Sequence, residues 1–572
     1  MNLSFPETVT EFNKKFLYTL VTNGPNKHPG SNSIQSVRPN GQLNKPRDLT
    51  YINDRSTIIL NVGDIVNRHL VDDDIILFNR QPSLHRMSMM GHRVKVMKGK
   101  SFRMNVNACP PYNSDFDGDE MNIHVPQSYQ TVAELRQLAY LPNHMINPKH
   151  NTPILGCNFD FIVGSYLLTQ DAVKFDKKTF MELAGWIKDF DGDISKITPD
   201  SNGQYSGKQL YSLIIPNINL NKRKNTEDLK NLFIENGNIK SGVVDKKTIG
   251  KSASGIVHIL WNDYGPLEAK KFIDNVAYVV NNYLLKIGFS VGISDIVPEK
   301  DIKDETNRLM EEKLSEVQEI INKANNGILK KISNKTTFDD FETQLIGVLG
   351  TSIQVTGEYA LNNIKKDNRV KRLVDSGSKG SSLNIAQMLA GLGQQSIENT
   401  RIPRGMNNRT LPHYFKYDVG TEAGGFIKNS YMDGLSPQEY YFHAISGRIG
   451  MIDTAIKTAK TGYITRKLVK AVEDVEICYD TTVRNSTNSI VQFIYGDDGF
   501  DSQKLEPINY PPLKISNNEF NNRYNYSFNK NLNSNTQQIV DNEFKQLQTD
   551  RFNVRNGLFH KNKELLYNQS FL

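Results

Sequence analysis

Hydrophobic and polar positions divide the chain into a strand-rich beginning and a helix-rich continuation. Residues 57–60 and 75–78 are short apolar runs interrupted by Gly, Pro and Asp, and residues 93–96 alternate polar and apolar side chains. Runs and alternations of this length are typical of short strands. Beyond about residue 128 the apolar spacing predicts helices, most clearly over 131–139 and 267–285. The pattern as a whole predicts a multidomain α+β protein.

Two further helices with charged outer faces are predicted between residues 301 and 366, separated near residues 334–336. The stretch 217–238 contains a Lys-Arg-Lys run and is expected to be an exposed insertion. Beyond about residue 515 the chain is rich in Asn and other polar residues. Because such a segment offers little apolar surface to bury, we expect partial disorder there unless a partner covers it.

One predicted helix is much longer than the others. Ser436, followed by Pro437 and Glu439, forms a capping box with proline at the first helical position. The helical pattern continues to about Asp474, which makes a rod on the order of 55 Å at 1.5 Å per residue. It contains three glycines, each costing roughly 1 kcal/mol relative to alanine, and a run of small residues in its middle. The helix therefore bends or is approached closely by another molecule, although the pattern fits a packed core helix equally well.

Composition and charge limit the classes of function that this chain can have. The net charge of +7 suits a nucleic-acid partner, but proteins with solvated lysine faces share it. No stretch approaches the roughly 20 apolar residues of a membrane span, and the first residues are no secretory signal. We therefore expect an intracellular protein that uses no membrane. Cys109, Cys157 and Cys478 form no CxxC pair, which argues against a disulfide framework and against a structural zinc site.

The strongest chemical signal is the run Asn-Ser-Asp-Phe-Asp-Gly-Asp-Glu-Met-Asn at residues 113–122. Asp115, Asp117 and Asp119 converge on one cation only if the backbone turns tightly between them, and Gly118 gives it that freedom. Oxygen ligands suit magnesium or calcium, and a cation would neutralise carboxylates that otherwise repel one another. An EF-hand does not fit, because its required Gly and Glu positions hold other residues. The alternative is a solvated acidic turn whose side chains point apart.

The chain also contains two imitations of such a site. Residues 189–193 repeat Asp-Phe-Asp-Gly-Asp without the flanking Asn and without an Arg-Gln-Pro segment shortly upstream. We interpret this copy as an exposed acidic turn. The turn Tyr-Gly-Asp-Asp at 495–498 resembles the catalytic turn of single-subunit RNA-dependent RNA polymerases, where paired aspartates bind magnesium. No convincing partner carboxylate motif precedes it, so we predict no catalytic role for it.

Three motifs occur together in the first part of the chain: Leu-Phe-Asn-Arg-Gln-Pro-Ser-Leu-His at 77–85, Met-Ser-Met-Met at 87–90, and the aspartate run at 113–122. Together they resemble the active-site region of the largest (β′-type) subunit of multisubunit DNA-dependent RNA polymerases. The likeness is to the eukaryotic polymerase II and giant-virus type. It continues through residues 245–250 and 288–292, Gly380 with residues 384–388, residues 393–396 and the long helix, and ends near Gly499.

The resemblance implies an architecture. Residues 1–130 would form part of a double-psi β-barrel that carries the aspartate loop, and residues 131–300 a pore domain. Funnel helices and a connecting segment would occupy residues 301–425. A long bridge helix and the start of the following domain would occupy residues 426–510, and an Asn-rich tail residues 511–572. The clamp, its zinc sites and the mobile trigger loop are not matched in this chain, which is therefore expected to be the middle segment of a split subunit. Either the gene is split by an intervening element, or separate chains assemble into one subunit.

The resemblance also assigns roles to residues around the aspartate loop. Asp115, Asp117 and Asp119 match the ligands of the tightly held catalytic Mg²⁺ ion. Arg80 and Asn113 match the pair that senses the ribose hydroxyls of the incoming nucleotide. A guanidinium and an amide suit that task, because RNA and DNA precursors differ by one hydroxyl group.

Further roles are implied beyond the loop. Lys379 matches a lysine near the nucleotide phosphates. Thr458 and Ala459 match bridge-helix residues beside the template base, which would account for the small side chains there. Lys460 departs from the family pattern, which has an acidic residue at this position.

The implied function is DNA-templated RNA synthesis by two-magnesium nucleotidyl transfer, with one ion on the three aspartates and the second arriving with the nucleotide. The implied partners are the second-largest subunit, the chains that supply clamp and trigger loop, the DNA template, the RNA product and nucleoside triphosphates. The place of action would be the nucleus for a cellular protein, and a cytoplasmic viral factory or the virion for a viral one. The rival hypothesis is a non-catalytic remnant or assembly module that has kept the fold. A remnant has no chemical reason to retain the three aspartates together with Arg80 and Asn113.

Overall fold

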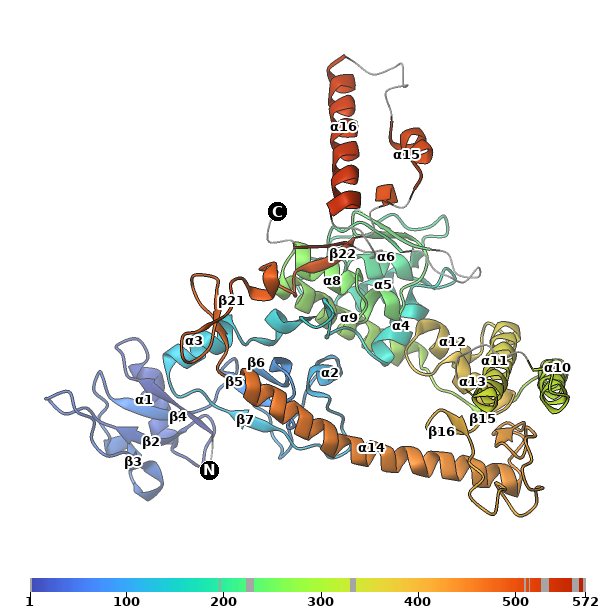
Figure 1. The fold of residues 1–572 in the computed structure, drawn as a ribbon. Coiled ribbons are helices and arrows are strands. Elements are labelled where there is room, and N and C mark those ends of the chain that lie inside the picture. Colours follow the sequence, from blue (N-terminus) through green and yellow to red (C-terminus); the bar gives the residue numbers. More distant parts are fainter. Residues whose placement is uncertain are drawn as a thin grey trace. The chain divides into compact units, whose positions relative to one another are not determined.

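The structure is a computed structural model that describes residues 3–194, 197–222, 231–329, 336–508, 511–513, 515–525, 534–557 and 565–568. The chain divides into two compact units. Figure 1 shows the elements of the chain, coloured by residue number. The larger unit comprises residues 1–145 and 153–468, and the smaller comprises residues 146–152 and 469–572. None of the helices in the described ranges combines the length and the apolar character that a membrane span requires.

The larger unit begins with a small module of one sheet and one helix. Its antiparallel sheet has the order β1-β4-β2-β3. The bounds are β1 Ser4–Thr8, α1 Lys14–Asn23, β2 Ser31–Gln35, β3 Arg47–Asp48 and β4 Ile65–His69. Leu17 and Leu20 of the helix pack in one apolar core with Ile34 and Val66 of the sheet. The module therefore has a hydrophobic core of its own.

A second antiparallel sheet, of order β6-β5-β7, positions the candidate site. Its strands are β5 Ile75–Asn79, β6 Met89–Arg93 and β7 Asn122–His124. The central strand β5 is apolar along most of its length and pairs Asn79 with Met89 on one side and with Asn122 on the other. Because these pairs lie at the end of β5, Arg80 follows at the same edge of the sheet as the residues that precede β7.

The expected strands of this region are confirmed in part. Residues 75–78 lie in β5, as predicted. Residues 57–60 contain instead the end of η2 (Arg55–Thr57), a 3-10 helix, followed by irregular chain. Strand β6 ends where the alternation at 93–96 begins, and the Val96 N–H donates to an aspartate side chain at 2.9 Å. Backbone pairing ends at Val94, which bonds to residues 73 and 74, and the strand predicted at 93–96 does not form because a side chain accepts the Val96 N–H.

The α+β class is confirmed, but the described residues among 1–130 form no closed barrel. They form two open antiparallel sheets, of four and three strands, that share no strand. A barrel requires every strand to have a neighbour on both sides. In these sheets β1, β3, β6 and β7 are edges.

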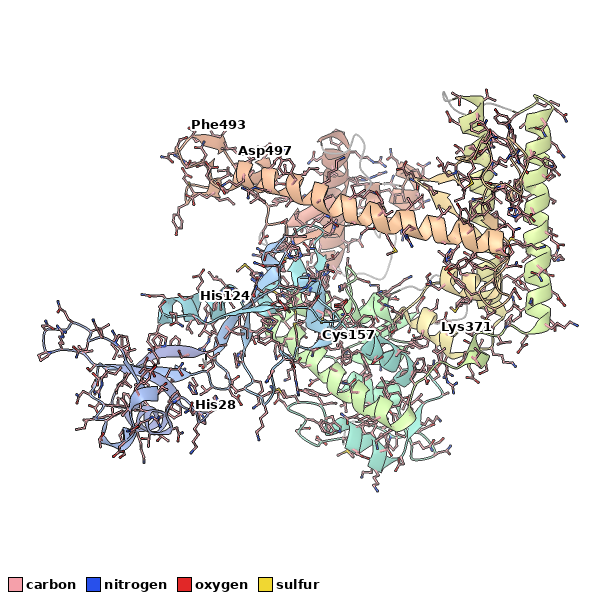
Figure 2. The ribbon with its side chains drawn as sticks, turned by 90° about the horizontal axis from the view of Figure 1, so that it is seen from below. His28, His124, Cys157, Lys371, Phe493 and Asp497 are labelled. Atoms are coloured by element: carbon pink, nitrogen blue, oxygen red, sulfur yellow. The ribbon has the colours of Figure 1, made fainter. Side chains whose placement is uncertain are left out.

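Residues 145–287 contain a large apolar core built mainly from helices. Helix α3 Tyr129–Gln137 precedes this region, whose own helices are α4 Asp160–Leu168, α5 Lys177–Ala184, α6 Gly207–Ser212, α7 Lys246–Ile249, α8 Ile256–Asp263 and α9 Pro266–Ile287. Helices α3 and α9 confirm the predictions over 131–139 and 267–285. Phe180, Phe272 and Cys157 are buried in the core, and Figure 2 labels Cys157.

The expected exposed insertion at 217–238 is instead partly core. Strands β12 Leu220–Lys222, β13 Leu232–Glu235 and β14 Asn238–Ser241 form an antiparallel sheet. Leu232 and Ile234 are fully buried. Residues 223–230, which hold most of the basic run, lie outside the described ranges.

Four helices follow in the larger unit. They are α10 Lys300–Asn325, α11 Thr337–Asn363, α12 Arg369–Ser376 and α13 Ser382–Leu389. The first two confirm the predicted pair, although most of the predicted break near 334–336 lies outside the described ranges. Thr336 starts α11 with a capping box, in which its hydroxyl and the Asp339 carboxylate satisfy each other's backbone N–H groups.

The long helix is α14, Pro437–Val472. Its predicted capping box is confirmed, with Glu439 N–H donating to Ser436 Oγ at 3.3 Å and Ser436 N–H donating to Glu439 at 2.8 Å. Phe442 is its one buried side chain among the described residues. A β-carbon added at Gly447 would meet nothing within 4 Å. Within this chain α14 is therefore an exposed rod rather than a packed core helix.

The smaller unit, described by itself, holds short sheets and two helices. Its elements include β19 Glu476–Ile477, β20 Val483–Arg484, β21 Ile490–Gln492, η7 Tyr495–Asp497, β22 Leu505–Ile508, α15 Asn517–Tyr524, α16 Ser534–Gly557 and β23 Leu565–Asn568. Phe520 is buried, and the Arg551 guanidinium lies 4.4 Å from its ring centre. The tail thus has local order that its composition did not predict, while residues 526–533 lie outside the described ranges.

Candidate metal site

The aspartate loop lies between α2 (Cys109–Tyr112) and β7. Helix α2 ends at Asn113, whose left-handed backbone (φ 48°, ψ 43°) turns the chain out of the helix. Asparagine tolerates this conformation better than most residues with a β-carbon. Gly118 has φ 118°, which glycine adopts without steric cost. Two turns that depend on these residue types therefore fold the run back on itself.

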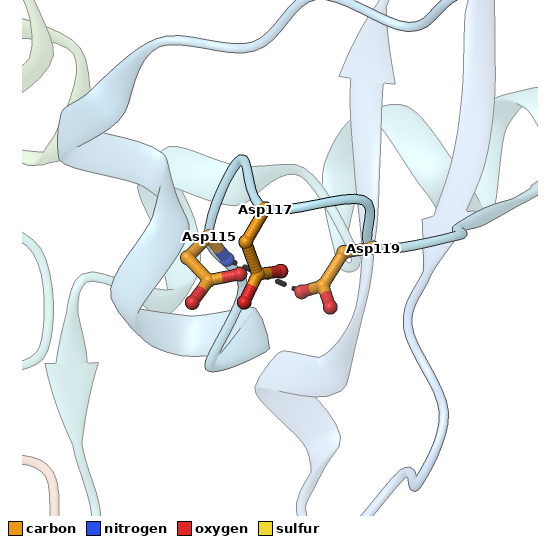
Figure 3. Close-up of side chains that lie close together, drawn as sticks. All are labelled: Asp115, Asp117 and Asp119. Atoms are coloured by element: carbon orange, nitrogen blue, oxygen red, sulfur yellow. Dashed lines mark hydrogen bonds between the residues drawn. The ribbon is translucent and has the colours of Figure 1, made fainter.

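The fold brings the three carboxylates together. One oxygen from each of Asp115, Asp117 and Asp119 lies within 4.8 Å of the other two, and no other such group of His, Cys, Asp or Glu is found among the described residues. Figure 3 shows the three side chains on the same side of the loop. The Asp115 N–H donates to Asp119 Oδ2 at 3.2 Å and thereby joins the two ends of the loop. The three carboxylates therefore do not point apart, as they would in the alternative of a solvated acidic turn.

The electrostatics of the cluster fit a cation. A hydrogen bond with Asp115 and the charge of that carboxylate raise the pKa of Asp117. Such a shift arises when like charges share a small space, and a bound cation relieves it. All three donors are carboxylate oxygens, which are preferred by hard divalent ions such as Mg²⁺ and Ca²⁺. Because Asp115 and Asp117 are also exposed, an ion can reach them without rearrangement of the core.

Arg80 binds one of the three carboxylates, that of Asp119. Its Nε donates to Asp119 Oδ2 at 2.8 Å, and a second guanidinium nitrogen lies 3.3 Å from Oδ1. Both side chains are 20% exposed. The hydrogen bond from Arg80 lowers the pKa of Asp119 and keeps that carboxylate ionised. Arg80 also donates to the Tyr112 carbonyl at 3.4 Å, next to Asn113, so the two predicted ribose-sensing residues lie at one corner of the loop.

An aromatic cluster of Phe78, His92 and Tyr112 packs next to the aspartate loop. The Phe78 ring packs edge-on against the rings of His92 and Tyr112. His92 Nε2 lies 2.6 Å from the Tyr112 hydroxyl. Burial lowers the pKa of His92 to about 4, so the imidazole is neutral at physiological pH. The loop therefore rests on a packed base and is not a free surface turn.

The remaining predicted site residues lie on other elements. Lys379 follows α12, and its Nζ lies 5.3 Å from the centre of the Phe159 ring. Thr458 and Ala459 are exposed in the middle of α14, where Thr458 Oγ1 donates to the Thr454 carbonyl at 2.8 Å. Within the described ranges, no hydrogen bond or ion pair joins these three residues to the aspartate loop. Sequence reasoning missed Phe159, which no local pattern marks.

The two imitations differ from this site. In residues 189–193 the Asp193 N–H donates to Asp191 at 2.9 Å, and Asp189 pairs with Lys271 at 3.0 Å. The Tyr-Gly-Asp-Asp turn forms η7 and is exposed, and Figure 2 labels its Asp497. Among the described residues, neither segment belongs to a group of side chains that could hold a metal ion. The interpretation of 189–193 as an exposed acidic turn is confirmed.

Comparison with known proteins finds matches along most of the chain. Four family models match consecutive segments: "RNA polymerase Rpb1, domain 2" at residues 1–141, domain 3 at 144–296, domain 4 at 303–427 and domain 5 at 434–557. The DNA-directed RNA polymerase II subunit RPB1-B of Trypanosoma brucei brucei is 39% identical over 511 residues, which is 88% of this chain. The chain is an Rpb1-like segment of a largest RNA polymerase subunit.

This result confirms the family that the sequence motifs suggested and places the aspartate loop in the Rpb1 domain 2 match. It corrects one boundary. The domain 5 match extends to residue 557, well beyond Gly499, where the sequence resemblance was expected to end. The chain spans about a quarter of the trypanosome relative, 28% of its length.

Proposed function

We propose that this Rpb1-like segment carries the catalytic magnesium site of a DNA-directed RNA polymerase and acts within a multisubunit complex. The observation that carries the proposal is the convergence of Asp115, Asp117 and Asp119 within 4.8 Å, in the segment that matches Rpb1 domain 2. Their oxygen-only donor set fits Mg²⁺. Bound Mg²⁺, with a second ion brought by the nucleotide, would supply nucleophile activation and charge stabilisation for nucleotidyl transfer.

The residues of the chain itself would prepare this chemistry. Arg80 fixes Asp119 through two guanidinium nitrogens and keeps it ionised, which holds one ligand in place before any ion binds. The remaining N–H groups of Arg80 and the exposed amide of Asn113 would contact the ribose hydroxyls. The exposed Lys379 would bind the triphosphate.

Thr458 and Ala459 would lie beside the template base. The exposure of α14 along nearly its whole length supports this assignment, since a solvent-facing rod of 36 residues has room for a nucleic-acid partner on its sides. In the assembled enzyme α14 is the bridge helix of this proposal. Its positive side chains would be matched by phosphates of template and product.

The wider assignments belong to the same proposal. The segment is of the polymerase II type, with residues 1–130, 131–300, 301–425, 426–510 and 511–572 as its divisions. The sheet β6-β5-β7 contributes to a double-psi barrel. Partners are the second-largest subunit, chains with clamp and trigger loop, DNA template, RNA product and nucleoside triphosphates. The place of action is the nucleus of a cell, or the viral factory or virion of a virus.

The test is promoter-independent RNA synthesis on a primed template by the affinity-purified native complex. Asp117→Ala should abolish magnesium-dependent synthesis while the complex stays intact. Asp191→Ala is the matched control, because it removes the corresponding carboxylate of the second Asp-Phe-Asp-Gly-Asp copy and should leave synthesis unchanged. Unaltered synthesis by Asp117→Ala would instead identify the segment as a non-catalytic remnant.

A further inference from the structure

The loop that carries Lys379 is a short link between two helices, and the N–H groups of Gly377 and Ser378 bond back to the last turn of the first helix. It lies between the end of α12 and the start of α13 and contains two glycines with positive φ, Gly377 at 74° and Gly380 at 82°. Lys379 is exposed at its tip. A lysine side chain with four rotatable bonds on such a loop samples many positions unless another part of the fold restrains it.

That restraint comes from Phe159, 220 residues earlier in the chain. The Ser378 hydroxyl donates to the Phe159 carbonyl at 2.7 Å, and Ser378 itself is buried. The Lys379 Nζ lies 5.3 Å from the centre of the Phe159 ring, where the negative face of the ring attracts the ammonium group. Phe159 thus contacts both Ser378, which precedes the lysine in the chain, and the side chain of Lys379 itself.

The backbone of Phe159 is unusual. It has φ 46° and ψ −117°, outside the conformations that a residue with a β-carbon ordinarily adopts. The Phe159 carbonyl also accepts the N–H of Ile162 at 3.0 Å at the start of α4. Strain of this kind persists only where the surroundings hold the residue in place, and it is concentrated at functional sites. The conformation points the carbonyl toward Ser378.

The same turn is joined to the base of the aspartate loop. The N–H of Asn158 donates to Oδ1 of Asn107 at 3.1 Å. Asn107 is 3% exposed and lies in the 3-10 turn η4 (Val106–Ala108), directly before α2 and the loop. The N–H of Cys157 donates to the Ile249 carbonyl at 3.0 Å, which fixes the other side of the turn in the core.

We infer that the turn Asn158-Phe159 positions Lys379 relative to the aspartate loop, so that Phe159 sets how well the triphosphate of the incoming nucleotide is bound. Phe159 is a positioning residue in this scheme, because it acts through Lys379 and touches no reacting atom. The inference rests on the proposed function and adds to it a residue that controls substrate affinity.

The experiment measures single-nucleotide addition by the purified complex over a range of nucleoside triphosphate concentrations. Phe159→Leu keeps an apolar side chain and removes the ring, and Phe159→Gly removes the ring while permitting the positive φ. A partly exposed cation–ring contact corresponds to about a two- to fivefold change in binding. Both variants should therefore raise KM by about that factor, with a smaller change in kcat.

A double-mutant cycle separates this role from general damage. Lys379→Met should raise KM by more than either Phe159 variant, and Phe159→Leu added to Lys379→Met should raise it no further. The matched control is Phe338→Leu, which removes a ring of similar exposure that carries Arg404 at 5.9 Å and has no link to the aspartate loop among the described contacts. It should leave KM unchanged.

Three outcomes would overturn the inference: an unchanged KM in Phe159→Leu, equal effects of Phe159→Leu and Phe338→Leu, or effects of Phe159→Leu and Lys379→Met that add independently. Each of these leaves the loss of synthesis in Asp117→Ala untouched. Failure of the proposed function would appear differently, as full synthesis by Asp117→Ala. The two failures are therefore distinguishable in one set of assays.

Discussion

The two Asp-Phe-Asp-Gly-Asp segments of this chain have the same five residues and different structures. In the first, at 115–119, the carboxylates converge within 4.8 Å, and a backbone N–H at one end of the loop donates to a carboxylate at the other. In the second, at 189–193, Asp191 accepts from its near neighbour Asp193, and Asp189 turns to Lys271. The short motif therefore does not determine whether its side chains form a site.

The difference comes from what holds the ends of each loop. The first copy begins at the left-handed Asn113, ends in β7, and has Arg80 across its last carboxylate. The second follows a short connection from α5, where the Lys188 N–H donates to Asn275, and its first carboxylate pairs with Lys271. In the first loop, two fixed ends and an arginine across the last carboxylate hold three like charges together, whereas in the second loop Lys271 pairs with Asp189 and the three carboxylates form no cluster.

The largest effect that tests this comparison is the loss of a metal site. Mn²⁺ binding to the purified complex, measured by electron paramagnetic resonance, should decrease by one ion per complex when Asp115, Asp117 and Asp119 are changed together to Asn. Amide oxygens lack the charge that binds a hard cation tightly. The same change at Asp189, Asp191 and Asp193 should leave the stoichiometry unchanged, and a lost ion there would refute the distinction.

The cationic partners of the two copies should also differ in effect. Arg80→Leu breaks a charge-assisted pair made by two nitrogens, worth about 1.5–3 kcal/mol, and should lower kcat/KM for nucleotide addition about ten- to a hundredfold. Lys271→Leu breaks a more exposed pair, worth about 0–1 kcal/mol, and should leave kcat/KM unchanged. Steady-state kinetics on a primed template decide between them. Equal losses in both variants would mean that the Arg80 contact is an ordinary surface pair.

A lower pH should reduce the stability of the aromatic cluster of Phe78, His92 and Tyr112 beside the first copy, and should not affect the second copy. The folded pKa of His92 is about 4, below the ordinary value of 6.5, so the unfolded form takes up the proton first. Stability is complete above pH 6.5 and is lost as the pH falls towards 4, by about 2 kcal/mol at pH 5. Protonation also removes the acceptor for the Tyr112 hydroxyl.

Hydrogen exchange checks this prediction. After correction for intrinsic rates, peptides covering 75–93 should exchange about 30-fold faster at pH 5 than at pH 7. Peptides covering 185–193 serve as the internal control and should not change. His92→Gln should abolish the dependence on pH over the first region. If it persists in that variant, another group is responsible.

The sequence predicted the elements that local rules determine. The capping box at Ser436, the strand at 75–78 and the helix at 267–285 follow from residue type and period, and all three formed. The strand at 57–60 failed because a 3-10 turn competes with it, and the buried Leu232 was unexpected because its partners come from distant segments. Periodicity carries no information about such contacts.

The candidate site was predictable to a similar extent. The three aspartates were found because their flanks are specific as well as their spacing. The contacts of Arg80 with Asp119, and of Phe159 with Lys379, join residues 39 and 220 positions apart, and tertiary packing alone produces them. The exposure of α14 was likewise undecided by its pattern, which fits a core helix and a rod equally well.

The smallest effect should come from the glycine of each copy. Gly118 has φ 118° and Gly192 has φ 81°, and an added β-carbon would meet nothing within 4 Å at either position. Alanine therefore costs backbone strain alone, about 1 kcal/mol at each site. In the first copy this strain opposes convergence of the carboxylates, so Gly118→Ala should raise the Mg²⁺ concentration for half-maximal synthesis about fivefold. Gly192→Ala strains the second turn to a similar degree and should leave the Mg²⁺ dependence unchanged. A Mg²⁺ titration of RNA synthesis by both variants makes the measurement. A shift in Gly192→Ala would show that the second turn also influences the metal site, and the contrast between the two copies would no longer hold.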